Sequence, residues 1–173
     1  MIGLKRGIVK LVPHQKEWAN LFEQERKSLN KILGNDIKIE HVGSTAIPGI
    51  MAKPIIDIAV GYTDDSQKEN IFDLIKSVGY EDMGEKGKIE YRFFAKGPDH
   101  NRTHYIHAVK YNSEGWNEMV LFRDFLLKDK EAREDYNKLK KALAEKYSNV
   151  REKYTEGKAE FINNILNRAK QLL

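Results

Sequence analysis

The chain contains no cysteine among its 173 residues, which excludes disulfide bonds and thiolate chemistry. Long apolar runs are also lacking, since none approaches the roughly 18 to 20 residues that span a bilayer. The segment Met1–Arg6 lacks the extended apolar core of a signal peptide. Together these absences favour a cytoplasmic protein with no membrane partner.

A large excess of one charge is absent as well. The net charge of +4 permits anionic ligands but falls short of the dense basic surface of a dedicated nucleic-acid binder. We therefore do not expect a nucleic-acid partner, although a steep salt dependence of RNA binding would reverse that expectation. Apolar residues make up 40% of the chain and charged residues 32%, which is typical of a globular protein with one core.

The spacing of apolar residues divides the chain into an α/β half over 1–112 and a helical half over 113–173. No proline follows Pro98 and no Gly/Ser linker separates the halves, so we treat them as a single unit. In the first half we expect helices over 15–33 and 64–78 and strands over 37–42, 55–61, 80–83, 90–95 and 103–110, with a turn over 84–87. In the second half we expect helices over 116–128, 131–147 and 156–172.

Most of the recognisable chemistry lies between residues 41 and 60. The turn Gly43-Ser44-Thr45 follows a predicted strand, and its glycine lets the backbone approach an anion while its hydroxyls donate hydrogen bonds. Further on, Asp57 is a single carboxylate in an apolar strand, where it must be solvated, paired or bound to a cation. With Lys53 between them, the turn and Asp57 predict a phosphate-and-metal site, and the alternative is that Asp57 pairs with Lys53.

Histidines and an arginine on other strands extend this site. His41, just before the turn, is a candidate metal ligand, base or core hydrogen-bonding group. On the strand over 103–110, His104 and His107 point to opposite faces because their separation is odd. The face that carries His107 can look across the sheet at Asp57, so His107 is a candidate ligand or base, with a core role as the alternative. Arg102, at the entrance of that strand, is a candidate phosphate ligand.

Taken together, these residues resemble the GrpB-like family of the DNA polymerase beta-like nucleotidyltransferase superfamily. The superfamily pattern of a Gly-Ser turn followed by an aspartate on a strand corresponds to Gly43, Ser44 and Asp57. The closer family pattern matches residues 41–57 almost position for position. The resemblance continues through Arg102–His107, Phe122–Asp124, Tyr136, Lys140 and Tyr154–Lys158, and so covers nearly the whole chain.

The resemblance implies an α+β fold, with a nucleotidyltransferase-like mixed β-sheet, flanking helices and a C-terminal helical bundle. It also implies that a divalent metal, Mg²⁺ or Mn²⁺, is held by Asp57 with His41 or His107, and that Asp57 and His107 act in catalysis. A nucleoside triphosphate or other phosphorylated small molecule would be bound by Gly43, Ser44, Thr45, Lys53 and Arg102, and by Arg123, Tyr136 and Lys140 from the helical half. The acceptor of the transferred group is not specified by the sequence.

One departure from the superfamily pattern leaves the enzymatic prediction open. Ala59 stands where a second carboxylate would help to hold two metal ions, which argues against a two-metal mechanism. The hypotheses are therefore a nucleotidyl or phosphoryl transferase with one metal, and a degenerate protein that binds a nucleotide or anion without turnover. A third is an RNA-binding or protein-interaction module that uses the Lys-rich helices from Lys128 to Lys158. The many acids in those helices favour solvated faces instead.

Overall fold

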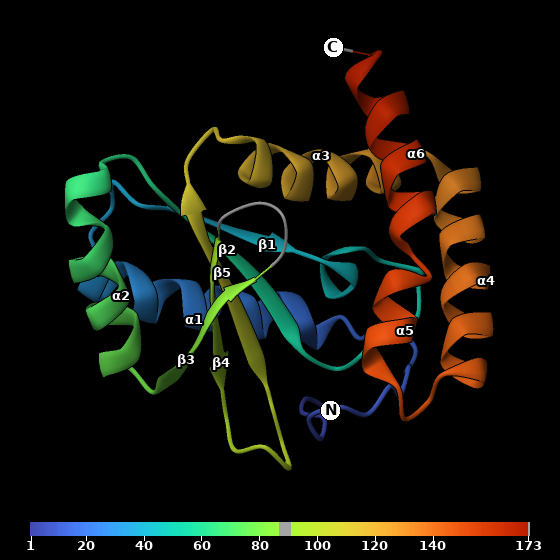
Figure 1. The fold of residues 1–173 in the computed structure, drawn as a ribbon, viewed down its shortest axis with the longest axis horizontal. Coiled ribbons are helices and arrows are strands. Elements are labelled where there is room, and N and C mark those ends of the chain that lie inside the picture. Colours follow the sequence, from blue (N-terminus) through green and yellow to red (C-terminus); the bar gives the residue numbers. More distant parts are fainter. Residues whose placement is uncertain (87–90, 173) are drawn as a thin grey trace.

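The computed structural model describes residues 1–86 and 91–172, which form an α+β fold around a five-stranded mixed sheet, as expected (Figure 1). The strand order is β1-β2-β5-β4-β3. Strands β2 and β5 are parallel, and the other neighbouring pairs are antiparallel. The bounds are β1 (Lys38–Val42), β2 (Ile56–Tyr62), β3 (Tyr80–Lys86), β4 (Tyr91–Lys96) and β5 (His104–Lys110).

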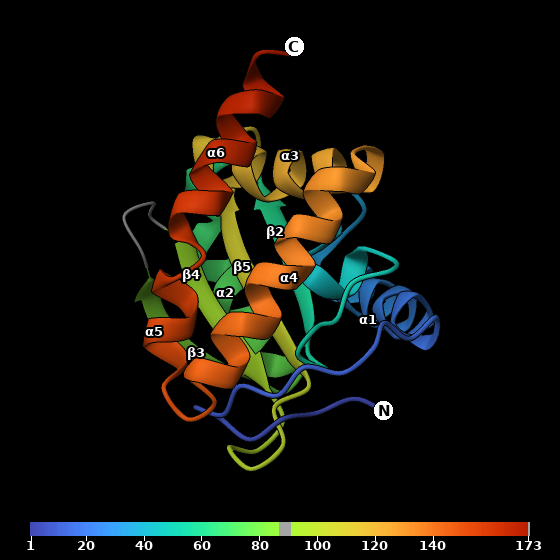
Figure 2. The ribbon, with the colours of Figure 1, turned by 90° about the vertical axis from the view of Figure 1, so that its right-hand side faces the viewer.

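Helices cover both faces of the sheet. Helices α1 and α2 lie on one face, while α3 to α6 lie on the other, where α4, α5 and α6 stand in front of the strands in Figure 2. None of the described helices combines the length and the apolar character that crossing a bilayer requires. The bounds are α1 (Glu17–Leu33), α2 (Lys68–Ser77), α3 (Glu114–Lys128), α4 (Lys130–Lys146), α5 (Arg151–Glu156) and α6 (Ala159–Lys170), with short 3₁₀ turns η1 (Ser44–Ala46) and η2 (Asp65–Gln67).

The main hydrophobic core lies between the sheet and helices α1 and α2. Ile56, Ile58 and Val60 of β2 point into it and are fully buried. Because side chains alternate along a strand, Asp57 and Ala59 point to the opposite face, toward the helical half. The alternation of β2 therefore places the single carboxylate on the side of the sheet that the C-terminal helices cover.

A second core joins the two halves of the chain. Ile47 and Ile50, from the loop between β1 and β2, pack with Leu126 of α3, Tyr136 of α4 and Ile165 of α6. The same loop is also hydrogen bonded to α4, since Met51 N donates to the side chain of Asn137 at 2.9 Å. The helical bundle is thus packed directly on the chain that connects the Gly43 turn to Asp57.

The helix expected over 156–172 is present as α6 (Ala159–Lys170), but the short helix α5 (Arg151–Glu156), which ends before Gly157, was not expected. An added Cβ on Gly157 would lie 2.5 Å from Leu143 Cδ2, so the backbone passes close to α4 at this point. Sequence periodicity does not detect this close approach, because it depends on a contact with a different helix.

The hairpin formed by β3 and β4 also differs from the expectation. Strand β3 does not end at Met83 but continues to Lys86. The pairing register with β4 shifts between Asp82 and Glu85, so Gly84, expected in the turn, lies within the strand. Asp82 Oδ1 accepts a hydrogen bond from Gly84 N at 2.9 Å, which holds this irregularity in place. Gly87, which ends the expected turn, and Glu90, which begins the next expected strand, lie outside the described residues.

Candidate functional site

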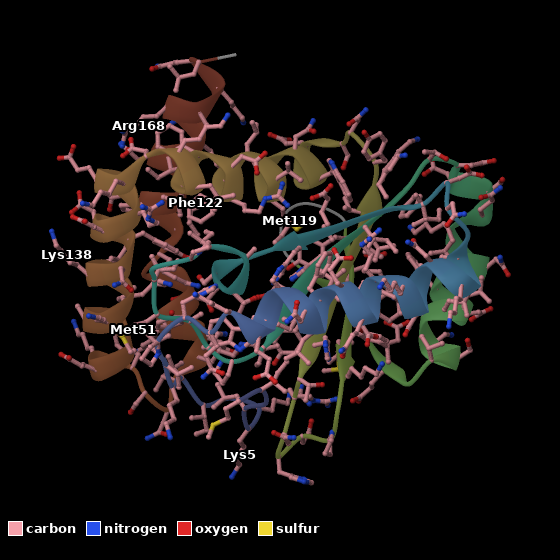
Figure 3. All side chains as sticks on the ribbon, turned by 180° about the vertical axis from the view of Figure 1, so that it is seen from behind. Lys5, Met51, Met119, Phe122, Lys138 and Arg168 are labelled. Atoms are coloured by element: carbon pink, nitrogen blue, oxygen red, sulfur yellow. The ribbon has the colours of Figure 1, made fainter. Side chains whose placement is uncertain are left out.

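A cleft of about 950 Å³ opens between the sheet face that carries Asp57 and the helical half of the chain. Its volume lies at the upper end of the range for small-molecule sites, roughly 300 to 1,000 Å³. Met119 and Phe122 of α3 contribute to its wall, and both are labelled in Figure 3 on the side of α3 that faces the sheet. The charged and hydroxyl-bearing residues of the lining are Arg6, Ser44, Thr45, Lys53, Asp57, Tyr91, Tyr105, His107, Glu118, Tyr136, Arg151, Glu152, Tyr154, Thr155, Glu156 and Lys158.

The turn after β1 is packed against Asp57. Gly43 has a φ of 69° and leads directly into the 3₁₀ turn that begins at Ser44. A Cβ added to Gly43 would lie 2.7 Å from Asp57 Oδ2, which is closer than real Cβ contacts allow. Glycine is therefore required both for the backbone conformation and for the approach of the carboxylate. An anion bound at this turn would lie beside Asp57.

We expect Gly43→Ala to destabilise the protein more than Gly49→Ala. Both glycines have positive φ, 69° and 87°, so each substitution carries a backbone strain of at least about 1 kcal/mol. A Cβ on Gly49 meets nothing within 4 Å, whereas one on Gly43 meets Asp57. The extra overpacking in Gly43→Ala should lower the free energy of unfolding by a further 1 to 3 kcal/mol or so, measured by urea denaturation. Equal losses in the two variants would contradict the close packing of turn and carboxylate.

Asp57 and His107 form a pair across the parallel strands β2 and β5. His107 Nε2 lies 3.3 Å from Asp57 Oδ1, so the face of β5 that carries His107 does look at Asp57, as expected. Burial of Asp57 opposes its ionisation, but the hydrogen bond and charge of His107, together with Lys53 and Arg151, outweigh it and hold the pKa of Asp57 below its ordinary value. Asp57 is therefore an anion at neutral pH.

The position of a second carboxylate is filled by an apolar cluster. Ala59 is fully buried and pairs in register with His107. It packs with Val42, Val109 and Trp116, the last of which reaches the sheet from α3. A carboxylate at this position would be buried among these apolar side chains at a cost of several kcal/mol. The single-carboxylate arrangement thus follows from the way α3 packs on the sheet.

Two lysines lie beside Asp57 against the ring of Tyr154, at one end of the cleft. Lys53 Nζ is 5.8 Å and Lys158 Nζ 4.6 Å from the ring centroid. Burial and the neighbouring charges of Arg151 and Lys158 lower the pKa of Lys53 to about 7. Burial also lowers the pKa of Lys158 to about 8, against the favourable charge of Asp57. The positive charges of these side chains repel one another, and a bound anion would offset this repulsion and stabilise the charged form of each lysine.

A third lysine lies behind the turn. Lys140 is 1% exposed, and its Nζ donates hydrogen bonds to Ser44 Oγ at 3.2 Å and to the carbonyl oxygen of Met51. Met51 lies beside α4 in Figure 3, which fits this contact. Burial and the charges of Lys158 and Lys53 lower the pKa of Lys140 to about 7. Tyr136 also forms a hydrogen bond with Ser44, so two groups from α4 hold the serine of the turn.

Most of the residues expected in the site are brought together by the fold. Gly43, Ser44, Thr45, Lys53, Asp57, His107 and Tyr136 line the cleft. Lys140 reaches it through Ser44. Three of the expected residues, His41, Arg102 and Arg123, are not part of the lining.

His41 points to the opposite face of the sheet. Its ring stacks on Phe22 of α1 at a centroid distance of 4.7 Å, and its Nε2 lies 3.0 Å from Thr45 Oγ1. Burial lowers the pKa of His41 to about 4, so the ring is neutral at physiological pH. The expectation that His41 joins Asp57 as a metal ligand is therefore not met, and of the three roles considered for it the core hydrogen-bonding one agrees with its position.

Arg102 and Arg123 are both occupied by ion pairs outside the cleft. Arg102 is 4% exposed and donates to Glu81 at 2.6 Å, to Asp99 and to the carbonyl oxygen of Gly97. Arg123 of α3 donates to Glu40 and Asp124 at 2.7 and 2.8 Å and to the carbonyl oxygen of His41. Their positions fit structural roles, in which Arg123 fastens α3 to β1, and do not bring them to a phosphate.

The structure adds residues that the sequence did not single out for the site. Arg151 and Lys158 both line the cleft. Lys158 carries a signal in the sequence, because it lies four residues after Tyr154 and so shares its face. Arg151 carries none, since it lies at the start of a six-residue helix without a periodic pattern. Glu152 and Glu156 are exposed on the same helix and form an acidic rim.

Protein ligands for a metal are few. Within the described ranges, no set of three or more His, Cys, Asp and Glu side chains is placed to hold one. Asp57 and His107 are adjacent and provide two donors. Mg²⁺ commonly uses one or two carboxylates and takes its other ligands from phosphate oxygens and water. The donor set therefore fits a cation that arrives with a phosphorylated ligand, and does not fit a closed structural site.

Comparison with known proteins agrees with this fold. A family model described as GrpB protein matches residues 8–168. The glutamate-rich protein GrpB of Alkalihalophilus pseudofirmus is 40% identical over 173 residues, which cover 96% of this chain and 99% of that protein. The crystal structure of a conserved GrpB protein from Enterococcus faecalis is 33% identical, with a TM-score of 0.83 over 92% of this chain and 96% of that one. A remote likeness to Cid1 poly(U) polymerase has a TM-score of 0.45 and 12% identity, over 76% of this chain and 45% of that one.

Proposed function

This chain belongs to the GrpB protein family, and we propose that its cleft binds a nucleoside triphosphate with a divalent cation and transfers the nucleotidyl group to a small acceptor. The observation that carries the proposal is Lys140. It is a fully buried cation that holds the turn serine Ser44, and the charges acting on it are those of two further lysines. A buried cation without a compensating anion is costly, and a bound phosphate chain would supply that anion.

The distribution of charge supports a phosphate chain at this end of the cleft. Lys53, Lys140 and Lys158 surround the Gly43 turn and Asp57, and burial lowers the pKa of each lysine. The other acids of the lining lie toward solvent or are already paired: Glu152 and Glu156 are exposed, and Glu118 forms an ion pair with Lys170 at 3.7 Å. A triphosphate would thus meet three cations and one carboxylate.

The divalent cation would be held by Asp57, with His107 beside it and phosphate oxygens completing its ligands. Bound there, it supplies neutralisation of the negative charge on the phosphates. The close approach of Gly43 to Asp57 Oδ2 supports this placement, because a phosphate on the turn amides would lie next to the carboxylate. The ion would be Mg²⁺ or Mn²⁺, both of which take carboxylate, phosphate and water oxygens as ligands.

In the proposed transfer, the acceptor oxygen bonds to the α-phosphorus while the bond between that phosphorus and the leaving pyrophosphate breaks. The acceptor proton passes to the His107 ring nitrogen that does not face Asp57, and the carboxylate of Asp57, which faces Nε2, stabilises the imidazolium that forms. The lysines then face the charge that develops on pyrophosphate. Positioning and charge neutralisation thus account for most of the rate acceleration in this scheme.

A second candidate function is nucleotide or anion binding without turnover. The observation that favours it is the apolar cluster at Ala59, which leaves no room for the second carboxylate of a two-metal mechanism. Both functions use the lysines of the cleft to bind the anion. Only the transfer reaction requires Asp57, which would hold the divalent cation.

We expect a nucleoside triphosphate with Mg²⁺ to bind more weakly as the pH rises from 7 to 9. Bound phosphates raise the pKa values of lysines that lie near 7 and 8 in the free protein, so binding takes up protons. Because the bound state holds more protons, alkaline solution favours the free state, and the affinity should fall at least tenfold over this range. Isothermal titration calorimetry at several pH values measures it. No saturable binding at pH 7 would refute the proposed function, and an affinity that rises with pH would refute the role of the lysines.

A further inference from the structure

The lining of the cleft contains two groups of residues of different chemistry. The lysine end consists of Ser44, Lys53, Lys140 and Lys158, and it accounts for the phosphates in the proposed function. The other group, which we call the aromatic end, is formed by Tyr91 and Phe93 of β4 and Tyr105 of β5, with Arg151 over the Tyr105 ring and close enough to Lys53, Lys158 and Asp57 to act on their pKa values. The proposed binding of a triphosphate and a cation makes no use of the aromatic end.

The aromatic end has a continuous floor of rings that reaches His107. The Tyr91 and His107 rings are 5.1 Å apart, those of Phe93 and His107 5.3 Å, and those of Phe93 and Tyr105 5.0 Å, all measured between centroids. The rings are inclined to one another by 48° to 60°, and they share one face of the sheet because of the register of β4 and β5, in which Phe93 pairs with His107. Aromatic floors of this kind hold planar or sugar rings by stacking and by burial of their faces.

A cation lies over this floor. The guanidinium carbon of Arg151 is 5.3 Å from the centroid of the Tyr105 ring, and Nη1 contacts the Tyr105 hydroxyl at 3.5 Å. Arginine has five N–H donors in a planar fork that matches carboxylate and phosphate groups. The contacts to Tyr105 occupy little of that fork. Arg6 lines the same cleft and is exposed, with a loose ion pair to Asp99 at 3.7 Å.

We propose that the aromatic end binds the acceptor of the transferred group, a small molecule that combines a ring with an anionic group. The ring would lie on Tyr91 and Phe93, and the anionic group would be bound by Arg151. This inference rests on the proposed function for the identity of the ligand as an acceptor. His107 contacts both Asp57 and the rings of Tyr91 and Phe93, so an acceptor bound on these rings would have its oxygen next to the group that takes its proton.

The acidic rim favours a small acceptor over the end of a nucleic acid. Glu152 and Glu156 are exposed on α5, the helix that begins with Arg151, and both line the cleft. A nucleic acid that entered the aromatic end would bring several further phosphates past these carboxylates, and each approach would be repulsive. A single anionic group that reaches Arg151 inside the rim avoids this repulsion.

The test uses phenyl phosphate as the ring-bearing probe and inorganic phosphate as the probe without a ring. The full-length protein is first saturated with a non-hydrolysable nucleoside triphosphate and Mg²⁺, and each probe is then titrated and followed by calorimetry and by saturation-transfer NMR. We expect phenyl phosphate to bind alongside the triphosphate at least tenfold more tightly than inorganic phosphate. Tyr91→Ala and Arg151→Gln should each weaken phenyl phosphate at least tenfold, while Tyr91→Ala leaves the triphosphate affinity unchanged.

Tyr111→Ala is the matched control, because Tyr111 packs on Trp116 and does not line the cleft. It should leave both ligands unaffected. Competition between phenyl phosphate and the triphosphate would overturn the inference, since the aromatic end would then hold the base of the nucleotide. The inference would also be overturned if the two probes bound with equal affinity, or if Arg151→Gln bound phenyl phosphate with the affinity of the wild type. If Tyr91-dependent binding of phenyl phosphate occurs without any triphosphate binding, the ring-and-anion site stands and the proposed function fails.

Discussion

Replacing Lys53 and Lys158 together with methionine should weaken triphosphate binding at least 100-fold and at the same time raise the melting temperature at pH 7. The loss of affinity corresponds to about 2.8 kcal/mol. It is expected because both lysines flank Asp57 at the lysine end of the cleft. Methionine retains the apolar part of each side chain against the Tyr154 ring, so packing is largely preserved.

The gain in stability follows from the sign of the pKa shifts. Folding lowers the pKa of these lysines from 10.5 to about 7 and about 8, so the unfolded chain holds protons that the folded chain has released. The free energy of unfolding of the wild type therefore rises between about pH 7 and pH 10.5. The double variant lacks this cost at neutral pH. Its advantage should be largest at and below pH 7 and vanish near pH 10.5.

Lys146→Met with Lys153→Met is the matched control for this experiment. These lysines lie 5.3 and 6.0 Å from the centroid of the Tyr147 ring, in an arrangement like that at Tyr154, but they are exposed and do not line the cleft. The control removes the same charge and should change neither affinity nor stability appreciably. Calorimetry and thermal melts at pH 7 and pH 10 provide both readouts. Full triphosphate affinity in the Lys53/Lys158 variant would contradict the assignment of the lysine end.

The second large effect is expected for Asp57→Asn, which should abolish the metal dependence of triphosphate binding. In the wild type we expect Mn²⁺ to strengthen triphosphate binding at least tenfold through its contact with Asp57. In Asp57→Asn this increment should disappear, while binding without metal is retained or slightly strengthened, because the substitution removes a negative charge from a site that receives an anion. The transfer reaction, followed by release of pyrophosphate, should fall at least 1,000-fold.

Asp57→Asn should also lower stability at neutral pH. The pKa of Asp57 is lowered in the folded protein relative to its ordinary value of 3.8, so its charge contributes stability above that pH. The difference between the wild type and the variant should shrink as the pH falls through the folded-state pKa. Asp65→Asn is the control, since Asp65 is exposed on η2 and pairs with Lys110 away from the cleft. If Mn²⁺ still strengthens triphosphate binding in Asp57→Asn, Asp57 does not hold the metal, and the second candidate function, anion binding without turnover, is favoured.

The centre of the site could be predicted from the sequence because its geometry is local. The parity of β5 separates His107 from His104, and from it the face that carries His107 was expected to be able to look across the sheet at Asp57. The parallel register of β2 and β5 then brings His107 within 3.3 Å of Asp57. The absence of a second carboxylate at Ala59 was visible in the sequence, while the packing of Trp116 behind it was not.

The errors concern contacts between residues that are distant in the sequence. Arg123 is bound to Glu40, 83 residues away, and Arg102 to Glu81, so both arginines satisfy their charges within the scaffold. No local pattern reports such pairings. The close approach of Gly157 to α4 involves Leu143 of another helix, and Arg151 lies on a helix too short to show periodicity.

The central claim is that the Gly43 turn, Asp57 and the lysine end form a site for a metal-bound triphosphate. The most direct test is a crystal structure of the protein with a non-hydrolysable nucleoside triphosphate and Mn²⁺, with anomalous data to locate the metal. The account predicts phosphate oxygens on the amides of the turn and on Lys53 and Lys158, and an anomalous peak within about 2.3 Å of Asp57. A triphosphate bound elsewhere on the surface, or one bound in the cleft with the metal away from Asp57, would contradict it.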